Sequence, residues 1–221
     1  MLLEALLASA GMVLFALFAR ISLPWNLLSD LGLALAALAV LLSLRHERGM
    51  ACSEHVEWGG LLGFVPFESR AALLGVLGAV LGGGLGLLFR WKFGLHWFPG
   101  APGRFVPVAA AIGGMEELFY RGYLQGQLSR INGVLGVVGA AAAHAAYKTA
   151  LFVLPALSLS NGPPAAHVDW IVLAFWTFCG GLLFGALRQA ARNVVPPLAA
   201  HVAFDIVVYG ELARAPWWVW N

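Results

Sequence analysis

The sequence is poor in charged residues and in cysteine. The first shortage argues against a nucleic-acid-binding protein, and the second against a disulfide or a cysteine metal site. Only 11% of its 221 residues are charged, and the formal net charge is +2. Basic residues that are so few and so scattered do not form a nucleic-acid surface, so we expect no nucleic-acid partner. The two cysteines, Cys52 and Cys179, lie far apart. Neither has metal-ligand spacing, and together they do not predict a disulfide.

Apolar residues take the place of the missing charge. Hydrophobic residues make up 61% of the chain and the mean hydropathy is +0.82, so most of the protein must lie in a lipid bilayer. Runs near the length that crosses a bilayer, about 20 residues, occur at 2–20, 27–44, 72–90, 105–128, 134–157, 169–190 and 195–212. The runs at 61–67 and 94–99 are too short to span and predict interfacial or re-entrant segments.

We therefore predict an all-α, polytopic transmembrane helix bundle of about seven to eight spans. Such a chain would be a multi-pass protein of the cell (inner) membrane of a prokaryote. Small residues are dense at 78–84 and at 136–143, and small residues let neighbouring membrane helices approach closely. We expect helix contacts at both places.

Ionisable side chains are rare within the predicted spans, and they collect in the second half of the chain. The group comprises Glu116, Glu117, Arg121, His144, Lys148, His201 and Asp205. A charged group in a bilayer costs several kcal/mol unless it is paired or lines a wet cavity, so such residues are functional candidates. The first three spans contribute almost nothing ionisable at depth. We therefore predict one buried polar site, built by the later helices.

Helical spacing separates the roles of the two adjacent glutamates. Glu117 and Arg121 are four residues apart, so they share a helix face and predict an ion pair. Glu116 lies about 100° further around the same helix. One carboxylate is then neutralised structurally, while its neighbour Glu116 stays free for chemistry.

The two histidines of the group lie on later spans. His201 and Asp205 are four residues apart and share a face. His144 lies near the middle of its run, among alanines that leave room around it. Lys148 shares the face of His144 but lies nearer the helix end. We expect its side chain to extend to the membrane interface, without a role in the site.

A free glutamate and two histidines that converge in a low-dielectric pocket favour acid–base chemistry on a water molecule. Burial brings the proton affinities of a carboxylic acid and an imidazole closer together. Hydrolysis is therefore the reaction class that these residues predict. Structural alternatives remain open: a helix-locking ion pair for Glu117 and Arg121, a polar group of a transporter or channel for Glu116, and a core histidine for His144.

Three short motifs occur in order on separate predicted spans: Glu116-Glu117-x-x-x-Arg121, a later membrane histidine, and His201-x-x-x-Asp205. Together they resemble the motifs of the CAAX protease and bacteriocin-processing family. That family consists of glutamic intramembrane endopeptidases and includes the type II CAAX prenyl proteases. The stretches that flank the first and third motifs are similar too, and the resemblance covers residues 105–210, about half of the chain.

The resemblance implies a role for each residue: activation of the attacking water by Glu116 and His144, stabilisation of the oxyanion by His201 and Asp205, and structural support by Glu117 and Arg121. It implies a protease without cofactor or metal. Its partners would be the lipid bilayer and a membrane-anchored peptide or protein, with a prenylated CAAX-like C-terminus, a leader peptide or a C-terminal sorting signal. We expect N-terminal membrane helices at 1–104, a catalytic bundle at 105–212 and an interfacial tail at 213–221.

The chain departs from the family pattern at two positions. The family's second motif usually has Phe four residues before its histidine, and here that position is Ala140. The third motif often ends in Asn, where this chain has Asp205. An ionised Asp only accepts hydrogen bonds. Either Asp205 is protonated and donates to an oxyanion, or it orients His201, and we favour the second.

Two further hypotheses compete with a metal-free protease. Zinc is one, because the ligand types at Glu116, His144, His201 and Asp205 suit it, although no His-Glu-x-x-His helix is present. A non-enzymatic membrane protein is the other, as an immunity or scaffold relative that keeps the fold. A proton-coupled transporter is a version of the latter, but the chain has no convincing inverted repeat of broken helices.

Overall fold

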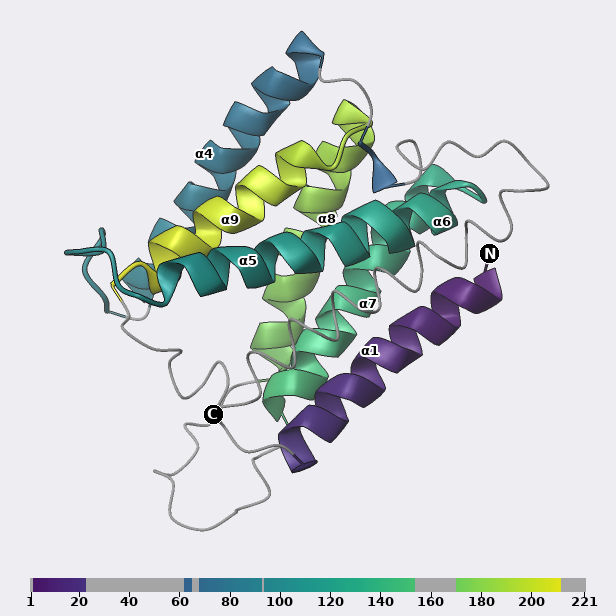
Figure 1. The fold of residues 1–221 in the computed structure, drawn as a ribbon, viewed down its shortest axis with the longest axis horizontal. Helices are drawn as coiled ribbons and strands as arrows, with labels where there is room; N and C mark the ends of the chain where they lie inside the picture. The colour runs from purple at the N-terminus through teal and green to yellow at the C-terminus, as the bar shows by residue number, and fades with distance from the viewer. Residues whose placement is uncertain (1, 23–61, 65–67, 93, 154–169, 212–221) are drawn as a thin grey trace.

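Every regular element is a helix in the part of the chain that the computed structural model describes, which is residues 2–22, 62–64, 68–92, 94–153 and 170–211. The elements are α1 (Leu2–Ser22), α4 (Ser69–Lys92), α5 (Val106–Glu117), the π-helical segment η1 (Leu118–Leu124), α6 (Gln125–Ser129), α7 (Gly133–Val153), α8 (Trp170–Ala191) and α9 (Val195–Tyr209) (Figure 1). The predicted all-α class is confirmed.

The predicted spans agree with these helices wherever both are described. The run at 27–44 lies outside the described residues, as does most of the run at 61–67. Residues 94–99, predicted as an interfacial or re-entrant segment, contain no helix. Three helices are long and apolar enough to cross a membrane, at Ser69–Lys92, Gly133–Leu151 and Trp170–Ala191. Leu2–Leu17 and Val195–Tyr209 are shorter apolar helices.

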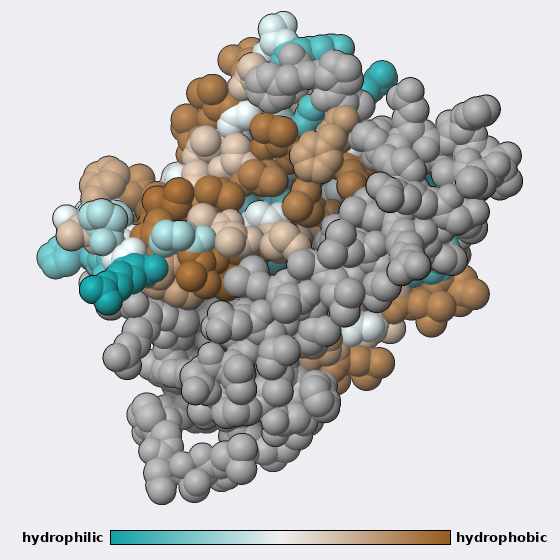
Figure 2. Space-filling view, viewed as in Figure 1, coloured by the Kyte–Doolittle hydropathy of each residue, from teal (hydrophilic) through white to brown (hydrophobic). Residues whose placement is uncertain are grey.

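The surface matches a membrane environment. Large hydrophobic side chains such as Val80 on α4 and Phe175 on α8 are more than half exposed. Hydrophobic residues cover the visible face over α4 and α9, and hydrophilic residues gather beyond both ends of α4 (Figure 2). An apolar band between polar ends is the pattern of a lipid-facing surface. We conclude that the chain is an integral membrane protein.

An asparagine side chain or a proline lies at the start of each α-helix that carries residues of the predicted polar site. Asn132 Oδ1 accepts hydrogen bonds from the backbone N–H groups of Val134 and Leu135, at 2.8 and 3.1 Å, and so caps α7. Asn193 Oδ1 accepts from the N–H of Val195 at 2.9 Å at the start of α9. Both α5 and α9 have proline in their first turn, where its missing N–H costs nothing.

Helix α9 lies between α4 and α5 (Figure 1). Gly78, Gly82 and Gly86 of α4 face it, and a Cβ atom at Gly82 would overlap the backbone of Ala200. The absence of side chains therefore lets the two helix backbones touch. The second small-residue stretch packs on α6, where a Cβ at Gly139 would come within 2.7 Å of a Leu128 methyl carbon. Both expected contacts are confirmed.

Gly82→Ala therefore tests how α9 is placed. The added methyl meets backbone, which cannot rotate away, so we expect a loss of about 1–3 kcal/mol of stability. Thermal unfolding in detergent measures it. Gly83→Ala is the matched control, because nothing lies within 4 Å of its Cβ position and Ala favours the helix over Gly by about 1 kcal/mol. Equal melting temperatures for the two variants would contradict the contact.

A buried arginine binds the C-terminal end of α9. Arg90 at the end of α4 is 0% exposed, and its guanidinium donates to the carbonyl oxygens of Val207 and Val208 at 3.3 and 3.4 Å. It also donates to Glu211 at 2.9 Å, and this hydrogen bond holds the pKa of Glu211, beyond the end of α9, below its ordinary value. Cations stabilise helix C-termini. Arg90 lies in the last turn of α4, so it is a buried ionisable residue at the end of a span.

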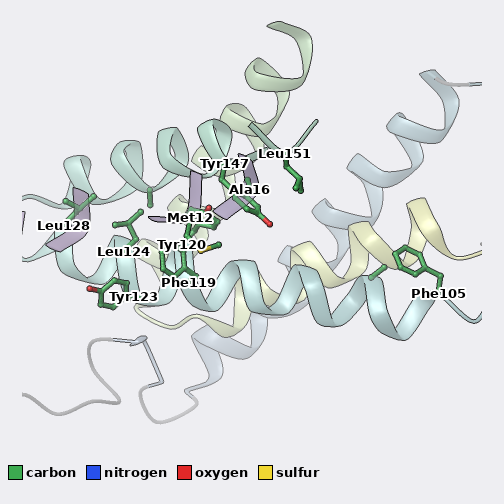
Figure 3. Packing of buried hydrophobic residues seen from close by; sticks show 13 residues of the cluster. Met12, Ala16, Phe105, Phe119, Tyr120, Tyr123, Leu124, Leu128, Tyr147 and Leu151 are labelled. Carbon is green, nitrogen blue, oxygen red and sulfur yellow. The ribbon is translucent and has the colours of Figure 1, made fainter. Parts of the chain in front are cut away.

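Aromatic side chains of η1 fill the core beside α1 and α7. Phe119, Tyr120 and Tyr123 pack with Tyr147 of α7 and with Met12 of α1 (Figure 3). Phe119 and Tyr120 meet edge to face, with ring centroids 4.9 Å apart. This packing fixes the helix that follows the two glutamates.

Candidate active site

The two adjacent glutamates lie where the helix changes its winding. Helix α5 ends at Glu117, and the π-helical segment η1 begins at Leu118. A π-helical turn inside an α-helix is rare and often lies at a functional site. Glu117 is fully buried, and Glu116 is 5% exposed. The predicted ion pair is confirmed, since Arg121 Nη1 lies 2.9 Å from Glu117 Oε1.

Glu117 also binds the histidine of the third motif. Its Oε1 atom accepts a hydrogen bond of 2.7 Å from His201 Nδ1. Because a carboxylate accepts, Nδ1 of His201 carries the hydrogen. The Nε2 atom of the same ring faces Glu116 Oε2 at 3.7 Å and Asp205 Oδ2 at 3.9 Å. Glu117 therefore connects α5 to α9 as well as neutralising Arg121.

The neighbours of His144 fix its tautomer. Arg121 Nη1 lies 2.8 Å from His144 Nδ1, and because arginine only donates, Nδ1 must be the unprotonated acceptor. The hydrogen of the neutral ring then lies on Nε2, which is 3.1 Å from Glu116 Oε2. The Tyr120 ring stacks on the imidazole with centroids 4.4 Å apart. His144 thus donates to Glu116 and cannot rotate without losing three contacts.

Lys148 belongs to the site. Its Nζ atom lies 2.6 Å from Glu116 Oε1, and its side chain is 20% exposed. The predicted extension of Lys148 to the interface is wrong, because the face that it shares with His144 points at Glu116. Glu116, which is predicted to stay free for chemistry, thus has Lys148 at Oε1 and the two histidines at Oε2. The shared face was the sequence signal that could have placed Lys148 here.

Asp205 is near His201 without a direct hydrogen bond. Its 3.9 Å separation from Nε2 exceeds hydrogen-bond distance. Glu117, bonded to Nδ1 at 2.7 Å, is the carboxylate that orients the ring. The favoured role of Asp205 as the orienting group therefore passes to Glu117. His201 Nε2 lies beyond direct hydrogen-bond distance from both Glu116 Oε2, at 3.7 Å, and Asp205 Oδ2, at 3.9 Å.

The same region of the chain matches a known family. A family model described as Type II CAAX prenyl endopeptidase Rce1-like matches residues 98–207, which include every site residue named above. The chain belongs to this family. No curated protein and no solved structure matches the chain. The Rce1-like family is a protease family, so the buried carboxylates and histidines of this membrane protein lie in a hydrolase fold.

A glycine of α5 makes room for the third motif of this Rce1-like protein. A Cβ at Gly113 would overlap Asp205 Oδ2 and come within 3.1 Å of His201 Cδ2. These are side-chain atoms, so the neighbours would shift without unfolding α9. Helix α5 therefore provides the glutamates and also the space that the histidine and aspartate need.

Gly113→Ala should lower proteolytic activity more than stability. Displacing His201 by about 1 Å is expected to cost up to about 10²-fold in rate. Gly114→Ala is the matched control on the next residue, where nothing lies within 4 Å of the Cβ position. Initial cleavage rates of the two variants, at matched melting temperatures, check the expectation. Equal cleavage rates for the two variants would show that activity does not depend on the space left by the missing side chain of Gly113.

The donor atoms of the site do not suit a zinc ion. Both nitrogens of His144 are engaged, one by Arg121 and one by Glu116. The cation Lys148 contacts Glu116, a carboxylate that zinc would need. Within the described ranges, no group of three or more His, Cys, Asp or Glu side chains is placed as metal ligands. The arrangement is that of hydrogen-bonded ion pairs.

Ala140, where the family usually has Phe, is 1% exposed within the core cluster. Its neighbour Ala141 is the residue that a Cβ at Gly181 of α8 would approach to 2.9 Å. Small residues on both helices therefore bring α7 and α8 together beside His144. Ala140 itself packs in the core cluster that contains Phe119, Tyr120 and Tyr147.

Proposed function

We propose that the protein is a glutamic-type intramembrane endopeptidase that hydrolyses a peptide bond of a membrane-tethered substrate. One observation carries the proposal. Glu116 Oε2, on α5, lies 3.1 Å from His144 Nε2 on α7 and 3.7 Å from His201 Nε2 on α9. The three helices thus bring two imidazole rings close to one oxygen atom of a buried carboxylate. Such a constellation suits proton transfer to and from water.

Glu116 is the general base in this mechanism. A water molecule held at Glu116 Oε2 gives its proton to the carboxylate while its oxygen attacks the carbonyl carbon of the scissile peptide. When the tetrahedral intermediate collapses, the carbon–nitrogen bond breaks and Glu116 returns the proton to the leaving amine. The products are a carboxylate and an amine. His144, which donates to the same oxygen at 3.1 Å, holds the carboxylate in place.

His201 is the oxyanion donor. Its Nδ1 atom donates a hydrogen bond to Glu117, and the carboxylates of Glu116 and Asp205 lie near its Nε2 atom. Opposite charges within about 4–6 Å favour the charged form of a group, so we infer an imidazolium with hydrogens on both nitrogens. The Nε2–H is then available to the oxyanion. Asp205 stabilises this cation, a role that an acceptor-only carboxylate can perform.

The substrate is proposed to be tethered to the membrane. Glu116, His144 and His201 are buried among apolar helices, so a substrate reaches them from the bilayer or its surface. The family description names a CAAX prenyl endopeptidase, so a prenylated CAAX-like C-terminus is the first candidate. A leader peptide and a C-terminal sorting signal are the other members of the same substrate class.

Cleavage by the purified protein in lipid nanodiscs tests this function. A prenylated CAAX peptide should be cut at one internal peptide bond, and exhaustive chelation should leave the rate unchanged. The unprenylated peptide of the same sequence is the control for tethering. A rate that is lost on chelation and restored by Zn²⁺ would favour a metal-dependent protease. No cleavage of any tethered peptide would favour a non-catalytic relative.

A further inference from the structure

Glu116 has a cation on one oxygen and imidazoles on the other. Lys148 Nζ lies 2.6 Å from Oε1, whereas His144 and His201 lie 3.1 and 3.7 Å from Oε2. The oxygen that faces the histidines is therefore not the one that the lysine holds. This division leaves Oε2 directed at the place where the proposed chemistry occurs.

Each of the two buried glutamates contacts a different cationic side chain. Arg121 contacts Glu117 at 2.9 Å, and Lys148 contacts Glu116 at 2.6 Å. Among the described residues, the other charged or titratable groups around Glu116 are Tyr120 and Glu117 on its own segment, His144 and Tyr147 on α7, and His201, Asp205 and Tyr209 on α9. Among the described residues, Lys148 is therefore the lysine or arginine in direct contact with the proposed base.

We propose that Lys148 is a positioning residue, which keeps Glu116 ionised and directs its Oε2 atom toward the histidines. The inference rests on the proposed function, in which Glu116 is the general base. Its physical basis is Coulombic, because a cation at 2.6 Å in a low-dielectric site stabilises the carboxylate strongly. The partly exposed Lys148 adjusts as Glu116 gains and returns a proton. Arg121, fully buried between Glu117 and His144, does not have that freedom.

A substrate carboxylate is the competing partner for Lys148. A CAAX-like end has three residues after its prenylated cysteine, and an extended chain of that length spans about 10 Å. Lys148 is in contact with the proposed base itself, too close to the scissile bond to reach such a terminus. The geometry therefore favours an action on Glu116 over recognition of the substrate's end.

The pH profile of kcat/KM tests the proposal, measured for the wild type and for the variants Lys148→Met and Lys148→Arg. Lys92→Met is the control, because it removes an exposed cation at the end of α4. In Lys148→Met, the acidic limb should move to higher pH by about one unit or more, the size of effect that an adjacent opposite charge has. Lys148→Arg should restore the wild-type limb, and Lys92→Met should not move it. An acidic limb that stays in place in Lys148→Met would overturn the proposal.

An infrared titration separates this inference from the proposed function, because it needs no turnover. The band of the protonated Glu116 carboxyl group, identified by its loss in Glu116→Gln, should appear at higher pH in Lys148→Met than in wild type. If wild type cleaves nothing, the proposed function fails while the titration still decides the role of Lys148. An unchanged titration would overturn that role even in an active protease.

Discussion

Glu116→Gln should abolish proteolysis while the helix bundle stays folded. Glutamine has the size of glutamate and still accepts a hydrogen bond from His144 Nε2, which lies 3.1 Å from Oε2 in the wild-type protein. It cannot take a proton from water, and a positioned general base contributes about 10²–10⁴-fold to a rate. Cleavage of the prenylated peptide should therefore fall by about that factor, measured as initial rates in nanodiscs.

The matched control for this variant is Glu68→Gln, which removes an exposed glutamate before α4. It should cleave at the wild-type rate. Both variants should melt as cooperatively as the parent, because neither change creates a cavity. Wild-type activity in Glu116→Gln would exclude this residue as the base, and the residues around it would then need another explanation.

Arg121→Met should remove both stability and activity. Arg121 is fully buried, and its Nη1 atom donates to Glu117 at 2.9 Å and to His144 at 2.8 Å. Removing one partner of a buried ion pair costs about 3–5 kcal/mol, because the other charge is left uncompensated. The donor that fixes the tautomer of His144 is lost at the same time. Chemical unfolding in detergent measures the first effect, and cleavage rates measure the second.

A double-variant cycle with Glu117→Gln separates the ion pair from simple packing. Once the glutamate is neutral, the methionine leaves no buried charge, so the two changes together should cost less than the sum of their separate costs. Arg130→Met, just beyond α6, is the control for loss of positive charge and should change stability little. Additive costs in the cycle would mean that the 2.9 Å contact contributes no coupling.

Much of the fold follows from local sequence, because bilayer thickness sets the length of an apolar span. The boundaries of α4, α7 and α8 could be predicted in this way, and Asn132 and Asn193 mark two helix starts. The π-helical turn after Glu117 could not, since no residue in Leu118–Leu124 requires it. Nor could the contact of Arg90 with the end of α9, because it joins residues more than a hundred positions apart.

The site shows the same division. Spacing of four residues predicts the pair of Glu117 with Arg121, because both lie on one helix. Which partner each remaining group takes depends on how α5, α7 and α9 cross, and sequence periodicity does not contain those crossings. For that reason periodicity does not predict the bond from His201 to Glu117. The face that Lys148 shares with His144 places these two side chains together, but it does not show that both meet Glu116 of α5. Spacing therefore predicts which polar residues share a helix face, but not their partners on other helices.

A single turnover in H₂¹⁸O tests most directly whether Glu116 acts on water. Enzyme in excess over prenylated peptide is stopped after one cleavage, and mass spectrometry locates the heavy oxygen. If Glu116 is a general base, one ¹⁸O enters the new C-terminal carboxylate of the product and none enters the Glu116 side chain. Heavy oxygen in the Glu116 carboxylate would show direct attack by the glutamate and would contradict the account.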